Sequence, residues 1–249
     1  MVTIDHGPAN MLDAALYEAL NQTTAALAAD RGVRVVIFDS ANDTIFVAGR
    51  NINEMADYEA TEDAALARVD TAQSLFSAIE RLPQPTIGVI TGHAMGGGCE
   101  FALALDFRIM VEGRPRIGQP EIDLGILPGG GGTQRLARLV GRGVATEMLM
   151  LGSRLDAAEA RAVGLVHQLA TDAAAARAAA DELAAALAVR PAGALAAAKR
   201  VIREGLDGTF AQGLDVERRE VSRLLLSADF TEGVAAFLEK RPPRFGEKA

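Results

Sequence analysis

Two runs of glycine, at 96–98 and 129–132, each precede a stretch with helical character. A glycine backbone lets a ligand approach closely, and the first N–H groups of a helix carry its positive dipole end. Such a place stabilises an anion, either a phosphate or an oxyanion that forms during a reaction. Glu100 lies one helical turn after the first run, and Glu121 precedes the second. Two carboxylates beside two such loops indicate general acid–base catalysis.

Phosphate binding is the weaker interpretation of these glycines. A P-loop needs Gly-Lys-Ser/Thr after the glycines, and no glycine run in this sequence is followed by Lys. The run that begins at Gly92 does not have the G-x-G-x-x-G spacing of a dinucleotide site. A purely structural role, in tight turns and close helix–sheet packing, stays open for either run considered alone.

Composition excludes several classes of partner. The 249 residues carry 25 Lys and Arg against 33 Asp and Glu, a net charge of −8. An acidic chain without a basic run is a poor nucleic-acid binder. Because no apolar run reaches about 18 residues, we expect no membrane span, and without a signal-peptide pattern we expect a cytoplasmic location. Cys99 is the single cysteine and no His/Cys/Asp cluster has metal spacing, so we expect no metal site.

Strand and helix signals alternate in the first half of the chain. Short β-branched or apolar runs predict strands at 2–4, 33–38, 86–90 and 107–111. Apolar residues at helical spacing predict helices at about 12–30, 62–80 and 97–105. This alternation indicates an α/β fold with a mostly parallel sheet and crossover helices.

The second half is dominated by helical signals. Asp229 with Glu232 resembles a capping box, and Pro191 is placed like a proline in the first turn of a helix. No linker rich in Gly, Ser and Pro interrupts the chain. We therefore expect a core at 1–190 and a C-terminal helical region at 191–249. The apolar residues of that region exceed what it can bury alone, which favours a closed symmetric oligomer.

Four motifs, taken together and in this order, resemble the crotonase superfamily, and within it most closely the enoyl-CoA hydratases. They are FVAG at 46–49, GHAMGGGCE at 92–100, GQPE at 118–121 and LPGGGGTQRL at 127–136. The similarity extends from about residue 2 to the segment FLEKR at 237–241. It implies a crotonase-like ββα spiral core followed by a C-terminal helical trimerisation region, assembled as a homotrimer or a dimer of trimers.

The resemblance also implies an acyl-CoA thioester substrate, an oxyanion hole of two backbone N–H groups, and a reaction that needs no cofactor, since coenzyme A is part of the substrate. Matched position by position, it assigns eight residues: the oxyanion donors Arg50 and Gly97, the catalytic pair Glu100 and Glu121, and the substrate-binding residues Ala48, Ile52, Gly129 and Lys240. The family position of Lys240 reaches the CoA bound to a neighbouring subunit.

Both glutamate positions of the hydratases are filled by Glu, which favours hydration of a 2-enoyl-CoA to a 3-hydroxyacyl-CoA, in fatty-acid or related acyl-CoA breakdown. Superfamily membership alone does not give the reaction. The alternative is a Δ3–Δ2 enoyl-CoA isomerase that uses only Glu121, or another acyl-CoA enzyme of the crotonase superfamily. A scaffold that has become a binding protein is a third possibility, against which the 12–30 helix, free of lysine, argues.

One departure from the family pattern and one further carboxylate bear on the site. Arg50-Asn51 stands where the family has Ala or Gly followed by Asp. A backbone donor tolerates this change, and we expect the Arg50 side chain to alter the CoA rim. Asp123, two residues after Glu121, would face the same way on an extended segment and add a third carboxylate.

Overall fold

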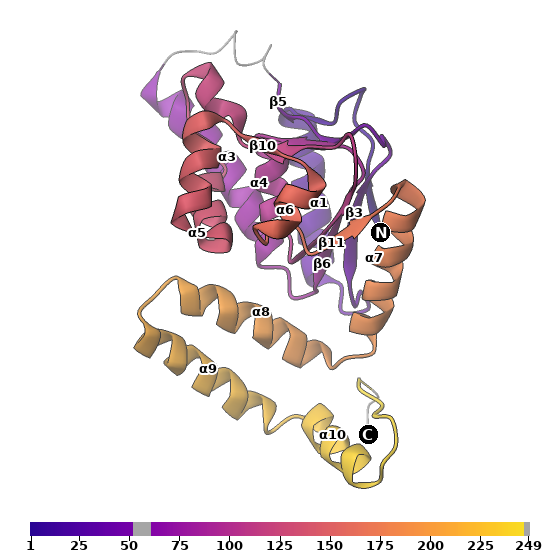
Figure 1. Cartoon of the computed structure of the whole chain (residues 1–249). Helices are drawn as coiled ribbons and strands as arrows, with labels where there is room; N and C mark the ends of the chain where they lie inside the picture. The colour runs from indigo at the N-terminus through magenta and orange to yellow at the C-terminus, as the bar shows by residue number, and fades with distance from the viewer. Residues whose placement is uncertain (52–60, 247–249) are drawn as a thin grey trace.

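Figure 1 shows the computed structural model of the chain, which describes residues 1–51 and 61–246. The elements, in chain order, are β1 (Val2–Ile4), β2 (Met11–Leu12), α1 (Ala14–Ala29), β3 (Val36–Ser40), β4 (Ile45–Val47), β5 (Gly49–Arg50), α3 (Glu62–Glu80), β6 (Thr86–Ile90), β7 (His93–Met95), α4 (Gly97–Leu103), β8 (Phe107–Val111), β9 (Ile117–Gly118), the 3₁₀ helix η1 (Pro120–Leu124), α5 (Gly132–Leu151), β10 (Arg154–Leu155), α6 (Ala157–Ala162), β11 (Gln168–Ala170), α7 (Ala173–Ala188), α8 (Ala192–Leu206), α9 (Phe210–Leu224) and α10 (Ala228–Leu238).

A parallel sheet of five strands, in the order β1-β3-β6-β8-β11, forms the centre of the fold. Every residue of β3 and β6 is buried, as expected for strands that are covered on both faces. Ile37 and Ile87 point to the face covered by α7, where they pack with Ala176. Val36 and Phe38 point to the opposite face, which α1, α3 and α4 cover.

An aromatic cluster fixes helix α4 in this second layer. The Phe101 ring lies 5.3 Å from the ring of Phe38, 5.7 Å from Phe46 and 6.2 Å from Phe76, measured between centroids. All four side chains are fully buried. Glu100 directly precedes Phe101, so this packing sets the position of its carboxyl group.

The short strands of a second sheet position the first glycine run. This sheet, in the order β10-β9-β7-β4, is parallel except between β10 and β9. The β7–β9 pairing ends in a hydrogen bond from the Gly96 N–H to the Gly118 carbonyl, 2.9 Å long. A Cβ atom at Gly98 would overlap the carbonyl of Val47, so only glycine lets α4 pack this closely on β4.

Helices α8, α9 and α10 form an arm beside the two sheets (Figure 1), in which α8 packs against α9. The Lys199 ammonium ties α8 to the core: it lies 2.7 Å from Asp106 Oδ2 and donates to the Gln84 carbonyl at 2.9 Å. Large apolar side chains of the arm face outward, among them Phe210 at 83%, Leu226 at 90% and Phe237 at 82% exposure.

The predicted strands and helices of the first half are confirmed, with shifted ends for the strand predicted at 33–38 and for the helices predicted at 12–30 and 97–105. Strand β3 begins at Val36, opposite Thr86, because its neighbour β6 begins there. The first helix begins at Ala14: Asp13 caps it by accepting the Leu16 N–H, and Leu12 belongs to strand β2.

Two predicted helix starts in the arm are wrong. Ser227, and not Asp229, caps α10 by accepting the Phe230 N–H. Asp229 instead accepts the Gly246 N–H, and Glu232 pairs with Arg241. Pro191 occupies the N-cap of α8, one position before the predicted first turn.

Candidate active site

The two predicted oxyanion donors come together where β5 ends and α4 begins. Gly97 is the first residue of α4, where a backbone N–H has no acceptor within the helix. A Cβ atom at Gly97 would lie 3.8 Å from the Arg50 nitrogen, and one at Gly49 would lie 3.3 Å from the Gly97 nitrogen. Gly49 also has a φ of +94°, which favours glycine. The amides of Arg50 and Gly97 therefore lie close together at one wall of a cavity.

Glu100 projects from α4 and is 4% exposed. Its Oε1 atom accepts the Gly132 N–H at 2.8 Å, which joins α4 to the second glycine run. Burial raises the pKa of Glu100, while the backbone N–H groups of Gly132 and Gly130 oppose that rise by stabilising the carboxylate. Glu100 is thus a carboxylate with a fixed orientation.

Glu121 lies in η1 and lines the same cavity as Glu100, with its carboxyl group beside Gly96. A Cβ atom at Gly96 would lie 2.7 Å from Glu121 Oε1, so a larger residue there would displace the carboxyl group. Burial raises the pKa of Glu121 to about 7, and the negative charge of Glu100 adds to the rise. Among the described residues, Glu121 Oε2 has no hydrogen-bond partner although it is buried. Glu121 therefore holds a proton more readily than an ordinary glutamate.

Side chains of α3 and α5 hold the second glycine loop. Gln73 donates to the Gly129 carbonyl at 3.0 Å, and Arg135 donates to the Gly130 carbonyl at 2.8 Å. Arg135 is itself paired with Glu80 at 3.0 Å. With its carbonyls held outward, the loop turns its N–H groups toward Glu100.

These groups border a cavity of about 380 Å³. Its lining residues among those described are Tyr17, Ala48, Gly49, Arg50, Ala65, Arg68, Val69, Ala72, Met95, Gly96, Gly97, Glu100, Pro120, Glu121, Leu124, Ile126, Leu127, Gly129 and Gly130. Apolar side chains from α3 and from the segment after η1 make up most of the wall. The cavity therefore combines an apolar surface with a few converging polar groups, as ligand sites do.

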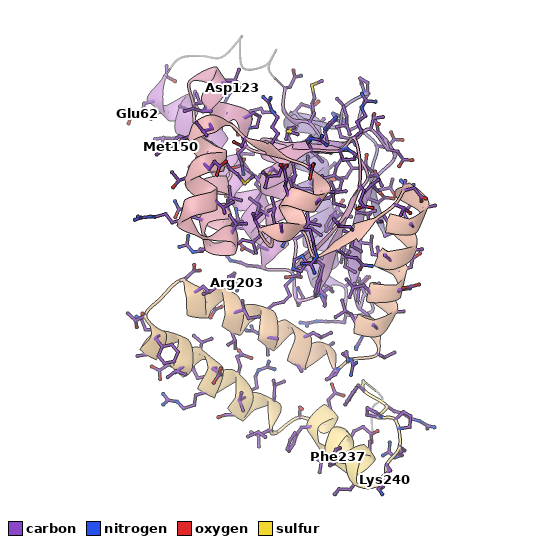
Figure 2. All side chains as sticks on the ribbon, viewed as in Figure 1. Glu62, Asp123, Met150, Arg203, Phe237 and Lys240 are labelled. Atoms are coloured by element: carbon purple, nitrogen blue, oxygen red, sulfur yellow. The ribbon has the colours of Figure 1, made fainter. Side chains whose placement is uncertain are left out.

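The structure brings six of the eight predicted site residues to this cavity: Ala48, Arg50, Gly97, Glu100, Glu121 and Gly129. Ile52 lies outside the described residues. Lys240 is exposed at the end of α10, and Figure 2 places it at the far end of the molecule from Glu62, the first residue of α3. Within one chain, Lys240 is not part of the cavity.

The predicted third carboxylate is wrong. Asp123 lies within the 3₁₀ helix η1 and not on an extended segment, so its side chain turns away from that of Glu121. It forms an exposed ion pair with Arg154 at 2.9 Å and does not line the cavity. Figure 2 shows Asp123 near the outer end of the molecule, above α5.

Sequence reasoning missed the Tyr17 ring and the α3 wall formed by Ala65, Arg68, Val69 and Ala72. Tyr17 is 6% exposed and follows Leu16 in α1, and no pattern along the chain distinguishes it from the core residues of that helix. Cys99 is fully buried beside the glutamates, and this burial raises the pKa of its thiol well above the usual range.

No group of three or more His, Cys, Asp or Glu within residues 1–51 and 61–246 is arranged to hold a metal ion. In the same part of the chain, no helix is long and apolar enough to cross a membrane.

Paired backbone amides beside one buried and one half-buried carboxylate, on this α/β fold, define an enzyme that polarises a carbonyl group and moves protons at the neighbouring carbons. The family model described as enoyl-CoA hydratase/isomerase matches residues 1–248, and the chain belongs to this family of enzymes. The resemblance to the crotonase superfamily is thereby confirmed.

Similar proteins extend over nearly the whole chain. The 2,3-dehydroadipyl-CoA hydratase of Escherichia coli is 36% identical over 95% of this chain and 90% of its own length. The human mitochondrial methylglutaconyl-CoA hydratase is 37% identical over 95% of this chain and 70% of its own. The crystal structure of an enoyl-CoA hydratase from Bacillus anthracis matches with a TM-score of 0.91 and 36% identity, covering 98% of this chain and 94% of that one. This similarity confirms the predicted α/β fold.

Proposed function

We propose that this enzyme adds water across the 2,3 double bond of a 2-enoyl-CoA and releases a 3-hydroxyacyl-CoA. The observation that carries the proposal is that Glu100 and Glu121 border one cavity with the amides of Arg50 and Gly97. An isomerase of the same family needs one acid–base group, whereas hydration uses two. The hydratase names of the similar E. coli and human proteins support the same choice.

In the proposed mechanism, the thioester carbonyl accepts hydrogen bonds from the N–H groups of Arg50 and Gly97. Negative charge moves onto that oxygen when water adds to the β-carbon, and the two donors stabilise the resulting enolate. Loss of one such donor typically costs about 3–4 kcal/mol of transition-state stabilisation. Because both donors are backbone groups, side-chain substitutions at the glutamates leave them in place.

Glu100 orients the water and takes one of its protons as the oxygen bonds to the β-carbon. Glu121 gives its proton to the α-carbon, whose new C–H bond completes the 3-hydroxyacyl-CoA. The two environments suit this division: backbone N–H groups hold the Glu100 carboxylate, and the raised pKa of about 7 keeps a substantial fraction of Glu121 protonated near neutral pH. The cycle closes when Glu100 loses its proton and Glu121 regains one. The proposed steps need no cofactor.

The test follows the loss of conjugated thioester absorbance of crotonyl-CoA. We expect the absorbance to fall when the wild-type protein hydrates crotonyl-CoA. Glu100→Gln and Glu121→Gln should each lower kcat by roughly 10²–10⁴, since Gln cannot exchange a proton near neutral pH. Glu147→Gln makes the same chemical change at an exposed site on α5 and serves as the matched control.

An isomerase gives a different pattern. Crotonyl-CoA would keep its conjugation, Glu121→Gln would abolish isomerisation, and Glu100→Gln would retain most of it. A binding scaffold would leave the substrate unchanged. Near-wild-type hydration by a folded Glu100→Gln protein would therefore overturn the two-glutamate mechanism.

We further propose that the chain works as a homotrimer or a dimer of trimers, in which Lys240 of one subunit approaches the CoA of its neighbour. The exposed apolar side chains of the arm support this assembly, because closed symmetry buries such a surface. A place in fatty-acid or related acyl-CoA breakdown and a cytoplasmic location stay predictions from the sequence.

A further inference from the structure

The Arg50 side chain is held at one wall of the cavity by two neighbours. Its guanidinium carbon lies 5.6 Å from the centroid of the Tyr17 ring, and its Nη2 donates to the Arg68 carbonyl at 3.3 Å. Tyr17, Arg50 and Arg68 also line a second cavity of about 340 Å³, between α1 and α3. The guanidinium therefore stands where the two cavities meet, fixed by an aromatic face and a backbone carbonyl.

The positive charge of Arg50 has no carboxylate within ion-pair distance among the described residues. The acidic residues of the second cavity are engaged elsewhere: Asp13 pairs with His6, and Glu18 accepts a hydrogen bond from Gln22. A half-buried guanidinium that lies against an aromatic ring and a backbone carbonyl is well suited to an anionic ligand group.

The position of the Arg50 guanidinium relative to the α- and β-carbons of the acyl group determines which part of a substrate can contact it. The Arg50 amide is the proposed carbonyl donor, while its side chain extends to Tyr17 on α1. Its charge acts on Glu100, whose pKa it lowers against the larger effect of burial. With the thioester at the amides and the β-carbon beside Glu100, the remote end of a short acyl group would extend along the apolar α3 wall toward this guanidinium.

We propose that Arg50, oriented by Tyr17, binds a carboxylate at the far end of the acyl group, so that the enzyme prefers CoA monothioesters of short unsaturated dicarboxylic acids. This inference rests on the proposed function for the orientation of the substrate. Arg50 then determines substrate specificity. Its backbone N–H binds the thioester carbonyl of any enoyl-CoA, whereas its side chain favours substrates whose acyl group ends in a carboxylate. A guanidinium and a carboxylate can form two parallel hydrogen bonds, which gives this choice geometric precision.

Binding of saturated acyl-CoA pairs tests the proposal without catalysis. Adipoyl-CoA and hexanoyl-CoA differ in having a carboxylate or a methyl group at the chain end, and titration calorimetry gives both affinities. We expect the wild-type protein to bind adipoyl-CoA more tightly. Arg50→Gln should lower the adipoyl-to-hexanoyl affinity ratio roughly 10- to 100-fold, the worth of a charge-assisted hydrogen bond.

The adipoyl-to-hexanoyl affinity ratio distinguishes whether Arg50 binds a carboxylate of the acyl group or a phosphate of CoA. If Arg50 bound a CoA phosphate, Arg50→Gln would weaken both ligands equally and leave the ratio unchanged, which would overturn the proposal. Arg50→Lys should keep part of the ratio, because it retains the charge without the fork geometry. Arg81→Gln removes a charge from an exposed position after α3 and should leave the ratio at its wild-type value.

Tyr17 supplies a second, independent variant. Tyr17→Leu removes the ring that holds the guanidinium and should lower the adipoyl-to-hexanoyl ratio, whereas Tyr17→Phe keeps the ring and should retain most of it. Circular dichroism of each variant confirms that the fold persists. An equal loss of both affinities in Tyr17→Leu, with the ratio intact, would also contradict the proposal.

The outcomes for function and for specificity are distinguishable. A protein that hydrates crotonyl-CoA but binds hexanoyl-CoA more tightly than adipoyl-CoA, with a ratio insensitive to Arg50→Gln, keeps the proposed function and loses this inference. A protein that hydrates no enoyl-CoA but shows the Arg50-dependent ratio loses the proposed function and keeps the carboxylate site.

Discussion

Glu121 and Glu100 differ in what surrounds each carboxyl group. Two backbone N–H groups stabilise the charged form of Glu100, while burial and the nearby Glu100 charge favour the protonated form of Glu121. This difference supports the proposed division of roles, with Glu100 as the base and Glu121 as the acid.

The pH dependence of kcat/KM follows from this difference. The proton on Glu121 is present below its pKa of about 7 and is lost above it, so kcat/KM for crotonyl-CoA should fall as the pH rises past neutrality. On the acid side, kcat/KM should fall as Glu100 takes up a proton, at a pH above the ordinary glutamate range because burial raises its pKa. Stopped-flow rates from about pH 5 to about pH 9 measure both limbs. An alkaline limb that persists in the residual activity of Glu121→Gln would assign it to another group.

Individual site residues were predictable from the sequence where their neighbours along the chain indicate a role. Glu100 and Glu121 stand beside glycine runs, and that proximity predicted a shared cavity. The Tyr17 ring escaped notice because its partners, Arg50 and Phe76, come from distant segments and its own helix shows only a core stripe. Asp123 was misplaced because a 3₁₀ helix, and not an extended segment, carries it.

The element that fixes the position of Glu100 is the second glycine loop, which contacts side chains of α3, α4 and α5. A Cβ atom at Gly130 would lie 2.6 Å from Phe76 Cε2 and 2.7 Å from Glu100 Oε2. Both neighbours are buried, so neither can move away without cost.

Gly130→Ala should therefore lower kcat by at least about tenfold and destabilise the fold by about 1–3 kcal/mol, because the methyl group displaces Glu100 and the Phe76 ring. Crotonyl-CoA kinetics and urea unfolding measure the two effects. Gly143→Ala, on α5 with nothing within 4 Å of its added Cβ, is the control and should keep wild-type kcat. Unchanged kcat in Gly130→Ala would show that the loop does not set the Glu100 position.

Element types were predictable from the sequence, and their ends were less so. The runs at 86–90 and 107–111 are apolar on both faces, and they form the buried strands β6 and β8. Strand β3 shifted because hydrogen bonding to β6, a tertiary effect, decides where it begins. The arm followed its helical pattern, yet Ser227 took the cap that Asp229 was expected to make, since its hydroxyl is placed to accept the Phe230 N–H.

For the whole molecule, the arm predicts the state of association. Its outward apolar side chains would leave a large hydrophobic surface in water, which monomeric proteins rarely do. Light scattering should give a trimer or a hexamer, and a double change of Leu226 and Phe237 to Ser should shift the distribution to smaller species. A stable wild-type monomer of 26.1 kDa in the same measurement would contradict the proposed assembly.

Lys240 gives a second prediction at this scale, because it is remote from the cavity of its own chain. If it meets the CoA of a neighbouring subunit, Lys240→Ala should raise KM for acyl-CoA more than it lowers kcat, and added salt should reduce the difference from wild type. Arg161→Ala, an exposed change on α6, provides the comparison. An unchanged KM would remove Lys240 from the site.

The reactivity of the buried Cys99 thiol reports local opening of the protein core. As the single sulfhydryl of the sequence, protonated and sealed between α4 and the sheets, it meets an alkylating reagent only when the core around the glutamates opens. The alkylation rate of Cys99 in the native protein therefore measures how often the core opens, without any engineered label. A ligand bound in the cavity should lower this rate. Mass spectrometry of the Cys99 adduct thus measures both local opening and ligand binding.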